Sequence, residues 1–146
     1  MTIKILVADN HPIVRQGLAL LLSGEPDMEV VGEAEDCFST LRLIPDLSPH
    51  VVIMDISMPD LNGVEATREI LSRFPKVKVI ALSMHSDSLF VLNMLNAGAS
   101  GYLLKDCALE ELVKAIRTVV TRKIYLSASL SDMLVTDLAH KITIDE

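Results

Sequence analysis

The sequence has few aromatic residues, no tryptophan and more acidic than basic side chains. Aromatic residues make up 3% of the 146 residues, and 13 lysines and arginines face 20 aspartates and glutamates, for a formal net charge of -7. Single-stranded nucleic acids bind to proteins on aromatic stacking platforms, and DNA binds on basic faces. We therefore expect neither kind of surface in this chain.

Cysteine and long apolar runs are also scarce. Cys37 and Cys107 lie far apart in the sequence, which favours inert free thiols in a reducing compartment over a disulfide framework. The longest apolar runs, such as residues 18–22, are far shorter than the ~20 residues that a membrane span needs. No charged segment with a long apolar stretch behind it opens the chain, so we expect no signal peptide and a cytoplasmic protein.

Short apolar segments recur along the chain and alternate with helical patterns. Half of the residues are hydrophobic, and the length suits one domain of about 100–200 residues. The predicted strands are residues 3–8, 30–33, 51–54, 77–82 and 102–104, and the predicted helices are residues 11–22, 63–74, 88–97 and 109–120, with a shorter helix after Asp36 that Pro45 should end. This alternation predicts an α/β fold, a parallel sheet with helices on both faces.

The end of the chain differs in character from the rest. Apolar residues recur there at helical spacing, at Leu130, Met133, Leu134 and Leu138. Ser127 or Ser129 could cap such a helix, because serine hydroxyls accept hydrogen bonds from the first free amides of a helix. We expect a globular domain over residues 1–125, followed by a linker or appended helix over residues 126–146.

Polar residues cluster directly after the predicted strands, where ligands bind in open α/β sheets. They are Asp9, Asn10 and His11 after the first strand, Asp55 and Ser57 after the third, Ser83 after the fourth, and Lys105 after the fifth. A carboxylate at the end of a buried strand needs partners. Carboxylate and amide oxygens suit Mg²⁺, and a lysine ammonium or a serine hydroxyl can hold a phosphoryl oxygen. The set predicts an acceptor site for phosphoryl transfer, with Asp55 as the nucleophile.

Four segments in order resemble the receiver domain of two-component response regulators. They are VADNHP at residues 7–12, DISMP at residues 55–59 with Gly63, ALS at residues 81–83, and GASGYLLK at residues 98–105. The resemblance covers roughly residues 1–125 and is nearest to the NarL/LuxR-type branch. It implies a flavodoxin-like, doubly wound sheet of five parallel strands in the order 2-1-3-4-5.

The resemblance also implies a role for each candidate residue. Asp55 would be phosphorylated from a sensor histidine kinase, and Asp9, Asn10, Asp55 and the backbone carbonyl of Ser57 would surround Mg²⁺. Ser83 and Lys105 would bind the phosphoryl group. Movement of Ser83 would let Tyr102 swing inward and reshape the nearby surface, as a two-state switch.

The implied output lies outside this chain. The resemblance implies a signalling module and not a turnover enzyme, acting as a homodimer, with a helix-turn-helix DNA-binding domain after residue 146. A second hypothesis is a phosphorylation-independent pseudo-receiver that serves as a dimerisation or interaction module. Asn10 favours this second hypothesis, because it stands where the family usually has an acidic residue and an amide is the weaker ligand for Mg²⁺. Met84 and Asp106 also depart from the family pattern, and the bulk of Met84 is expected to restrict access to the acyl phosphate.

Each candidate also has an ordinary structural explanation. Asp55 could cap a turn, Asp9 and Asn10 could end a strand, Lys105 could pair with Asp106, Ser83 could be a turn serine, and Tyr102 could be a plain strand aromatic. His11 and His85 are interpreted as solvated loop residues, because they lack zinc-ligand companions at suitable spacing.

The predicted helix at residues 88–97 is apolar on all sides, which is typical of a buried helix. Because a helix on a two-layer fold should have one wet side, we expect Phe90, Val91 or Met94 to lie in a partner interface. The alternative is that the C-terminal helix covers them.

Overall fold

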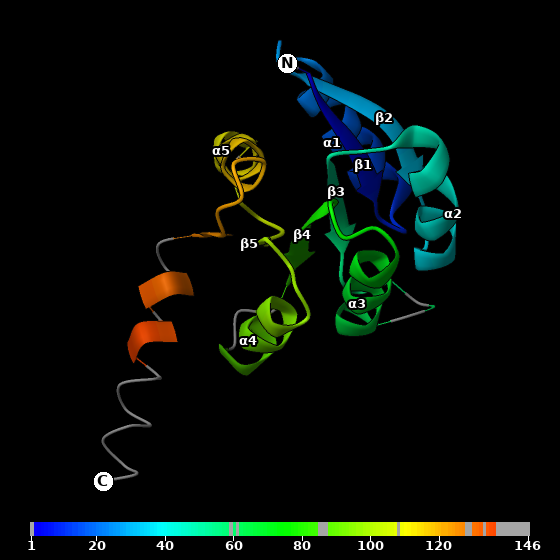
Figure 1. Ribbon diagram of the computed structural model, residues 1–146. Coiled ribbons are helices and arrows are strands. Elements are labelled where there is room, and N and C mark those ends of the chain that lie inside the picture. The colour runs from blue at the N-terminus through cyan, green and yellow to red at the C-terminus, as the bar shows by residue number, and fades with distance from the viewer. Residues whose placement is uncertain are drawn as a thin grey trace, which may run out of the picture.

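The structure is a computed structural model that describes residues 2–58, 60, 62–84, 88–107, 109–127, 130–132 and 134–136. Its sheet contains β1 (Ile3–Ala8), β2 (Met28–Ala34), β3 (Val51–Asp55), β4 (Lys78–Ser83), β5 (Gly101–Leu104) and β6 (Tyr125–Leu126). The strands pair in parallel in the order β2-β1-β3-β4-β5-β6 (Figure 1). The predicted α/β class and the order 2-1-3-4-5 are confirmed, and β6 extends the sheet by one strand that the sequence did not reveal.

The helices are α1 (Pro12–Ser23), α2 (Cys37–Leu47), α3 (Gly63–Arg73), α4 (Ser88–Asn96) and α5 (Leu109–Val119). Two apolar cores lie on opposite faces of the sheet. One contains buried residues of α2, α3 and α4, and the other contains buried residues of α1 and α5. Neighbouring strand residues alternate between them: Leu6 and Val52 face the first core, and Val7 and Ile53 face the second. Apolar strands without polar alternation follow from this double covering.

Pro45 does not end α2, contrary to the sequence prediction. The helix continues for two residues to Leu47 and ends at Ser48, which adopts a left-handed conformation with φ 48°. The amide of Ser48 donates to the carbonyl of Ile44 at 2.8 Å and so closes the last turn. A proline in a helix removes the hydrogen bond of its own nitrogen and crowds the carbonyl four residues earlier, and α2 accommodates Pro45 within its last turn.

Most apolar side chains of α4 are covered within the chain, although Leu89 is 69% exposed. Val91 and Met94 are fully buried in the core on that face, and Phe90 is half-buried. The expectation that Val91 or Met94 lies in a partner interface is wrong, because Leu130 and Leu134 of the C-terminal segment are buried in the same core. Figure 1 shows this segment beside α4.

The C-terminal segment is helical at residues 130–132 and 134–136. Ser127 caps it, since its hydroxyl accepts from the amide of Leu130 at 3.4 Å and its carbonyl accepts from the amide of Ser131 at 3.0 Å. Ser129, Met133 and Leu138 lie outside the described residues. Within the described part of the chain, no helix is both long and apolar enough to cross a membrane.

Candidate functional site

Two buried aspartates lie side by side at the carboxyl edge of the sheet. Ala8 of β1 pairs with Met54 of β3, so the following residues, Asp9 and Asp55, end adjacent strands. Asp9 is 1% exposed and Asp55 is 2% exposed. Buried carboxylates need compensating charge or hydrogen bonds, so their partners define the chemistry of this edge.

Asp55 has a different partner at each carboxylate oxygen. Its Oδ1 accepts hydrogen bonds from the Ser57 amide at 3.0 Å and from the Ser57 hydroxyl at 2.8 Å. Its Oδ2 lies 2.9 Å from Nζ of Lys105, which is also 3.5 Å from Oδ2 of Asp9. One lysine therefore faces both buried carboxylates.

The sheet register brings Lys105 to this position. Ser83 of β4 pairs with Leu104 of β5, and the amide of Lys105 donates to the carbonyl of Ser83 at 2.8 Å. Ser83 is buried at the end of β4, one strand away from Asp55. Residues that are far apart in the sequence thus meet at one edge, because all their strands run in parallel.

The surroundings of Asp55 favour its ionised form. Burial raises the pKa of its carboxyl group, but the Ser57 amide, the Lys105 ammonium and the Ser57 hydroxyl together hold the pKa below its ordinary value. Asp55 is therefore an anion at neutral pH, and one of its oxygens is available as a nucleophile.

Three buried oxygens at this edge lack hydrogen-bond donors. Oδ2 of Asp9, Oδ1 of Asn10 and Oδ2 of Asp55 accept no hydrogen bond within the described part of the chain. The contact of Asp55 with Lys105 is thus an ion pair without hydrogen-bond alignment. A buried acceptor without a donor costs about 1–3 kcal/mol, so three together fit a bound cation. Carboxylate and amide oxygens are the donors that Mg²⁺ takes.

Comparison with known proteins identifies the family. Residues 5–117 match the family described as the response regulator receiver domain. The chain belongs to this family. It is 38% identical over 144 residues to the transcriptional regulatory protein DegU of Brevibacillus brevis, covering 99% of this chain and 61% of DegU. It is 40% identical over 133 residues to the response regulator GacA of Pseudomonas protegens, covering 91% of this chain and 62% of GacA.

Solved receiver structures share the fold. A two-component response regulator of the LuxR family from Aurantimonas sp. SI85-9A1 has a TM-score of 0.90 and 34% identity, covering 95% of this receiver and 99% of that chain. The isolated REC domain of RcsB from Salmonella enterica serovar Typhimurium, with BeF3-, has a TM-score of 0.84 and 31% identity, covering 92% and 99%. The resemblance to the NarL/LuxR-type branch is confirmed. The receiver spans about three fifths of the length of DegU and GacA.

Tyr102 and Met84 occupy contrasting positions in this receiver. Tyr102 is fully buried in the core that contains α4, so its ring already lies inward. Met84 is 76% exposed, which places its side chain at the solvent side of the site. The ring of Tyr102 is therefore buried without the inward swing that the resemblance implied.

His11 lies closer to the acidic residues than its interpretation as a solvated loop residue suggests. Its side chain is 57% exposed, but its Nδ1 lies 3.0 Å from Oδ1 of Asp9 and 3.6 Å from Oδ2 of Asp55. Its amide also donates to Oδ1 of Asp9 at 2.8 Å. His11 follows Asp9 by two positions in the sequence, and this short separation was the signal that could have revealed their contact. His85 lies outside the described residues.

Sequence reasoning missed Asp60, which lies in the loop after Asp55. Its Oδ1 accepts from the amide of Cys37 at 3.1 Å, and its Oδ2 accepts from the amide of Phe38 at 3.0 Å. Burial raises the pKa of Asp60, but these amides lower it below its ordinary value. Asp60 thereby ties the loop after Asp55 to the first turn of α2.

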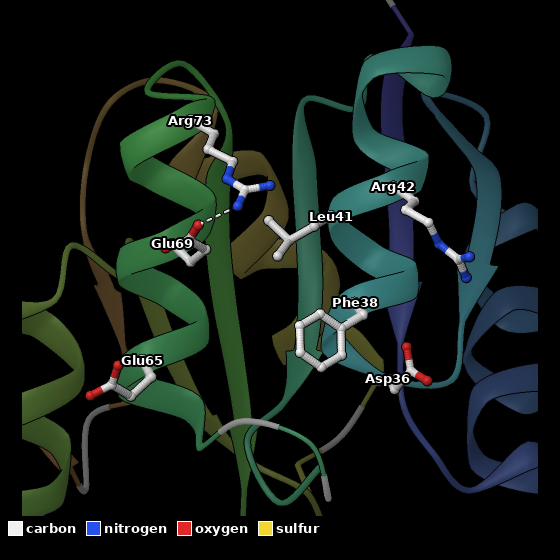
Figure 2. Close-up of a pocket in the computed structure, with 7 residues that line it drawn as sticks. All are labelled: Asp36, Phe38, Leu41, Arg42, Glu65, Glu69 and Arg73. Carbon is white, nitrogen blue, oxygen red and sulfur yellow. Dashed lines mark ion pairs between the residues drawn. The ribbon is translucent and has the colours of Figure 1, made fainter.

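A cavity between α2 and α3 lies away from the acidic edge. Its volume is about 600 Å³, and it is lined by Asp36, Phe38, Leu41, Arg42, Glu65, Glu69 and Arg73. Figure 2 shows Phe38 and Leu41 of α2 pointing toward α3, where Arg73 pairs with Glu69 at 2.6 Å. None of the predicted site residues lines this cavity. The candidate site is therefore recognised by its buried charged side chains and not by a large cavity.

Proposed function

We propose that this receiver accepts a phosphoryl group on Asp55 from a phosphohistidine of a sensor histidine kinase. The observation that carries the proposal is the buried, ionised Asp55, whose Oδ2 pairs with the ammonium of Lys105 at 2.9 Å. In the transfer, a carboxylate oxygen of Asp55 bonds to phosphorus as the phosphorus–nitrogen bond breaks, and the imidazole keeps that electron pair. The step is an acceptance event and not turnover.

The neighbouring residues of Asp55 would stabilise the charge on the transferred group. Mg²⁺ would be held by Asp9, Asn10, Asp55 and the backbone carbonyl of Ser57, and it would neutralise phosphoryl oxygens when bound. Lys105 would move from the carboxylate to a phosphoryl oxygen as a point charge. Ser83, buried beside it in the sheet register, would donate its hydroxyl to another phosphoryl oxygen.

Phosphorylation would be read out through Ser83 and Tyr102. A new charge at the end of β3 would draw Ser83 toward it and fix the buried Tyr102 ring against α4, which changes the surface presented to partners. In the whole protein we propose a cytoplasmic homodimer and a DNA-binding output domain. The names of relatives support this, since DegU is a transcriptional regulatory protein and a solved RcsB structure contains two dimers bound to two parallel DNAs.

Acetyl phosphate with Mg²⁺ tests the proposal directly. We expect intact-mass measurement to show the addition of one phosphoryl group, which disappears in Asp55→Asn and persists in the control Asp46→Asn on the exposed side of α2. If no phosphoryl group is added under any metal condition while the protein remains folded, the chain is a pseudo-receiver and the proposal is wrong.

A further inference from the structure

The acidic edge contains a nitrogen donor in addition to its oxygens. Asp9, His11 and Asp55 each present one ligand atom, and these three atoms lie within 4.8 Å of one another. His11 is the N-cap of α1, yet its side chain makes no capping hydrogen bond. The imidazole is thus not committed to holding the helix, and its Nδ1 points to the two aspartates.

The distances fit coordination of one ion by all three residues. Nitrogen and oxygen ligands lie about 2.1 Å from a divalent transition metal, so two ligands at right angles are about 3.0 Å apart, and two at a tetrahedral angle are about 3.4 Å apart. Nδ1 of His11 lies 3.0 Å from Oδ1 of Asp9 and 3.6 Å from Oδ2 of Asp55. The side chains therefore need little movement to bind a common ion.

The buried oxygens make a cation the natural occupant. Oδ2 of Asp9 and Oδ2 of Asp55 belong to nearly fully buried residues and accept no hydrogen bond in the described structure. A carboxylate oxygen has more than one acceptor direction, so Asp55 can face Lys105 and an ion together. In the structure, Nδ1 of His11 is hydrogen-bonded to Oδ1 of Asp9 at 3.0 Å, and because a carboxylate oxygen only accepts, Nδ1 carries the proton in that contact. Binding of an ion would displace this proton, so that Nδ1 donates its lone pair to the metal and Nε2 of the half-exposed ring carries the proton instead.

We propose that His11 is a metal ligand of this site, compensating for the neutral Asn10, and that the site prefers a borderline transition-metal ion to Mg²⁺. Imidazole nitrogen suits ions such as Zn²⁺ and Co²⁺, whereas Mg²⁺ takes oxygen ligands almost alone. This inference rests on the proposed metal site of the phosphoryl acceptor and changes its ligand set and its metal preference.

Co²⁺ and Mg²⁺ titrations of the whole chain test the inference. Calorimetry on the wild type should give a Co²⁺ affinity at least about tenfold above that for Mg²⁺, and the visible spectrum of bound Co²⁺ should report nitrogen coordination. His11→Ala should lower the Co²⁺ affinity about tenfold or more and change that spectrum, while the Mg²⁺ affinity stays within about threefold. Circular dichroism confirms folding, and His11→Gln, which keeps a polar side chain, provides a second variant.

His50→Ala is the matched control, because His50 lies at the other end of the sheet, where its Nδ1 accepts from the amide of Lys4 at 2.9 Å. Equal Co²⁺ affinity in His11→Ala and the wild type, or a wild type that binds Mg²⁺ as tightly as Co²⁺, overturns the inference. Phosphorylation from acetyl phosphate separates the two proposals. If the His11 variants still accept the phosphoryl group but metal preference is unchanged, only the inference fails, and if no metal supports phosphorylation, the proposed function fails.

Discussion

Lys105 is the residue on which the charge balance of the acidic edge depends. Its ammonium lies 2.9 Å from Asp55 and 3.5 Å from Asp9, and it is the only lysine or arginine that forms an ion pair with either carboxylate in the described structure. The sequence also allowed Lys105 to pair with Asp106, but within the described residues these two side chains form no ion pair. The negative charge of Asp9 and Asp55 is therefore balanced by the ammonium group of Lys105.

Replacing Lys105 by alanine should destabilise the fold at neutral pH. Asp9 and Asp55 would remain buried and unneutralised, and removing one partner of a buried pair costs about 3 kcal/mol, somewhat less here because Lys105 is partly exposed. Urea unfolding with a metal chelator measures the change, with Lys114→Ala on the exposed side of α5 as the control. The folded pKa of Asp55 is lowered, so this stabilisation is present above its unfolded pKa and is lost as pH falls through the folded pKa. If the difference in the free energy of unfolding between the wild type and Lys105→Ala does not decrease as the pH falls, this explanation is wrong.

Restoring the acid at Asn10 should strengthen oxygen-only metal binding. Asn10→Asp adds a third carboxylate at the edge, so the Mg²⁺ affinity should rise about tenfold and the metal-free protein should lose stability by like-charge repulsion. Calorimetric Mg²⁺ titration and urea unfolding with and without Mg²⁺ measure the two effects. Unchanged Mg²⁺ affinity would show that Asn10 does not face the ion.

At the scale of elements, Asp60 joins the loop after Asp55 to α2. Asp36 already caps this helix, since its carboxylate accepts from the amide of Ser39 at 2.7 Å. Asp60 supplies acceptors for the amides of Cys37 and Phe38, so two carboxylates share the free amides of one helix start. This cross-connection couples the loop after Asp55 to a helix that contributes no residue to the predicted site.

Asp60→Ala should loosen this connection without unfolding the receiver. Loss of a helix-start acceptor costs about 1 kcal/mol in the free energy of unfolding, measured in urea. Amide hydrogen exchange gives the sharper result: Cys37 and Phe38 should lose protection, while Ser39 keeps it through Asp36. Asp46→Ala, near the other end of α2, is the control. Equal protection of all three amides in the wild type and in Asp60→Ala would refute the role.

At the scale of the whole molecule, the pattern of apolar strands predicted the edge of the sheet that holds the candidate site, whereas the strand order came from the resemblance to receiver domains. Parallel strands bring their carboxyl ends together, so polar residues after apolar strands converge wherever the helices lie. Side-chain directions were not predictable in this way, which is why His11 was interpreted as a solvated loop residue and Asp60 was missed. The strand β6 has two residues, too few to show a pattern. The prediction that Pro45 ends its helix was wrong because α2 accommodates this proline within its last turn.

The C-terminal segment, for which the sequence left a linker and an appended helix open, should contribute to the stability of the whole receiver. Leu134 is buried in the same core as Val91 and Met94, so Leu134→Ala leaves a cavity and should lower the free energy of unfolding by about 2 kcal/mol. Val135→Ala, one residue along the helix and 66% exposed, should change it little. Urea unfolding compares the two variants with the wild type. A single unfolding transition, with a larger decrease in the free energy of unfolding for Leu134→Ala than for Val135→Ala, would show that the segment unfolds cooperatively with the rest of the receiver. Equal and small decreases in the two variants would show that the segment does not stabilise the core.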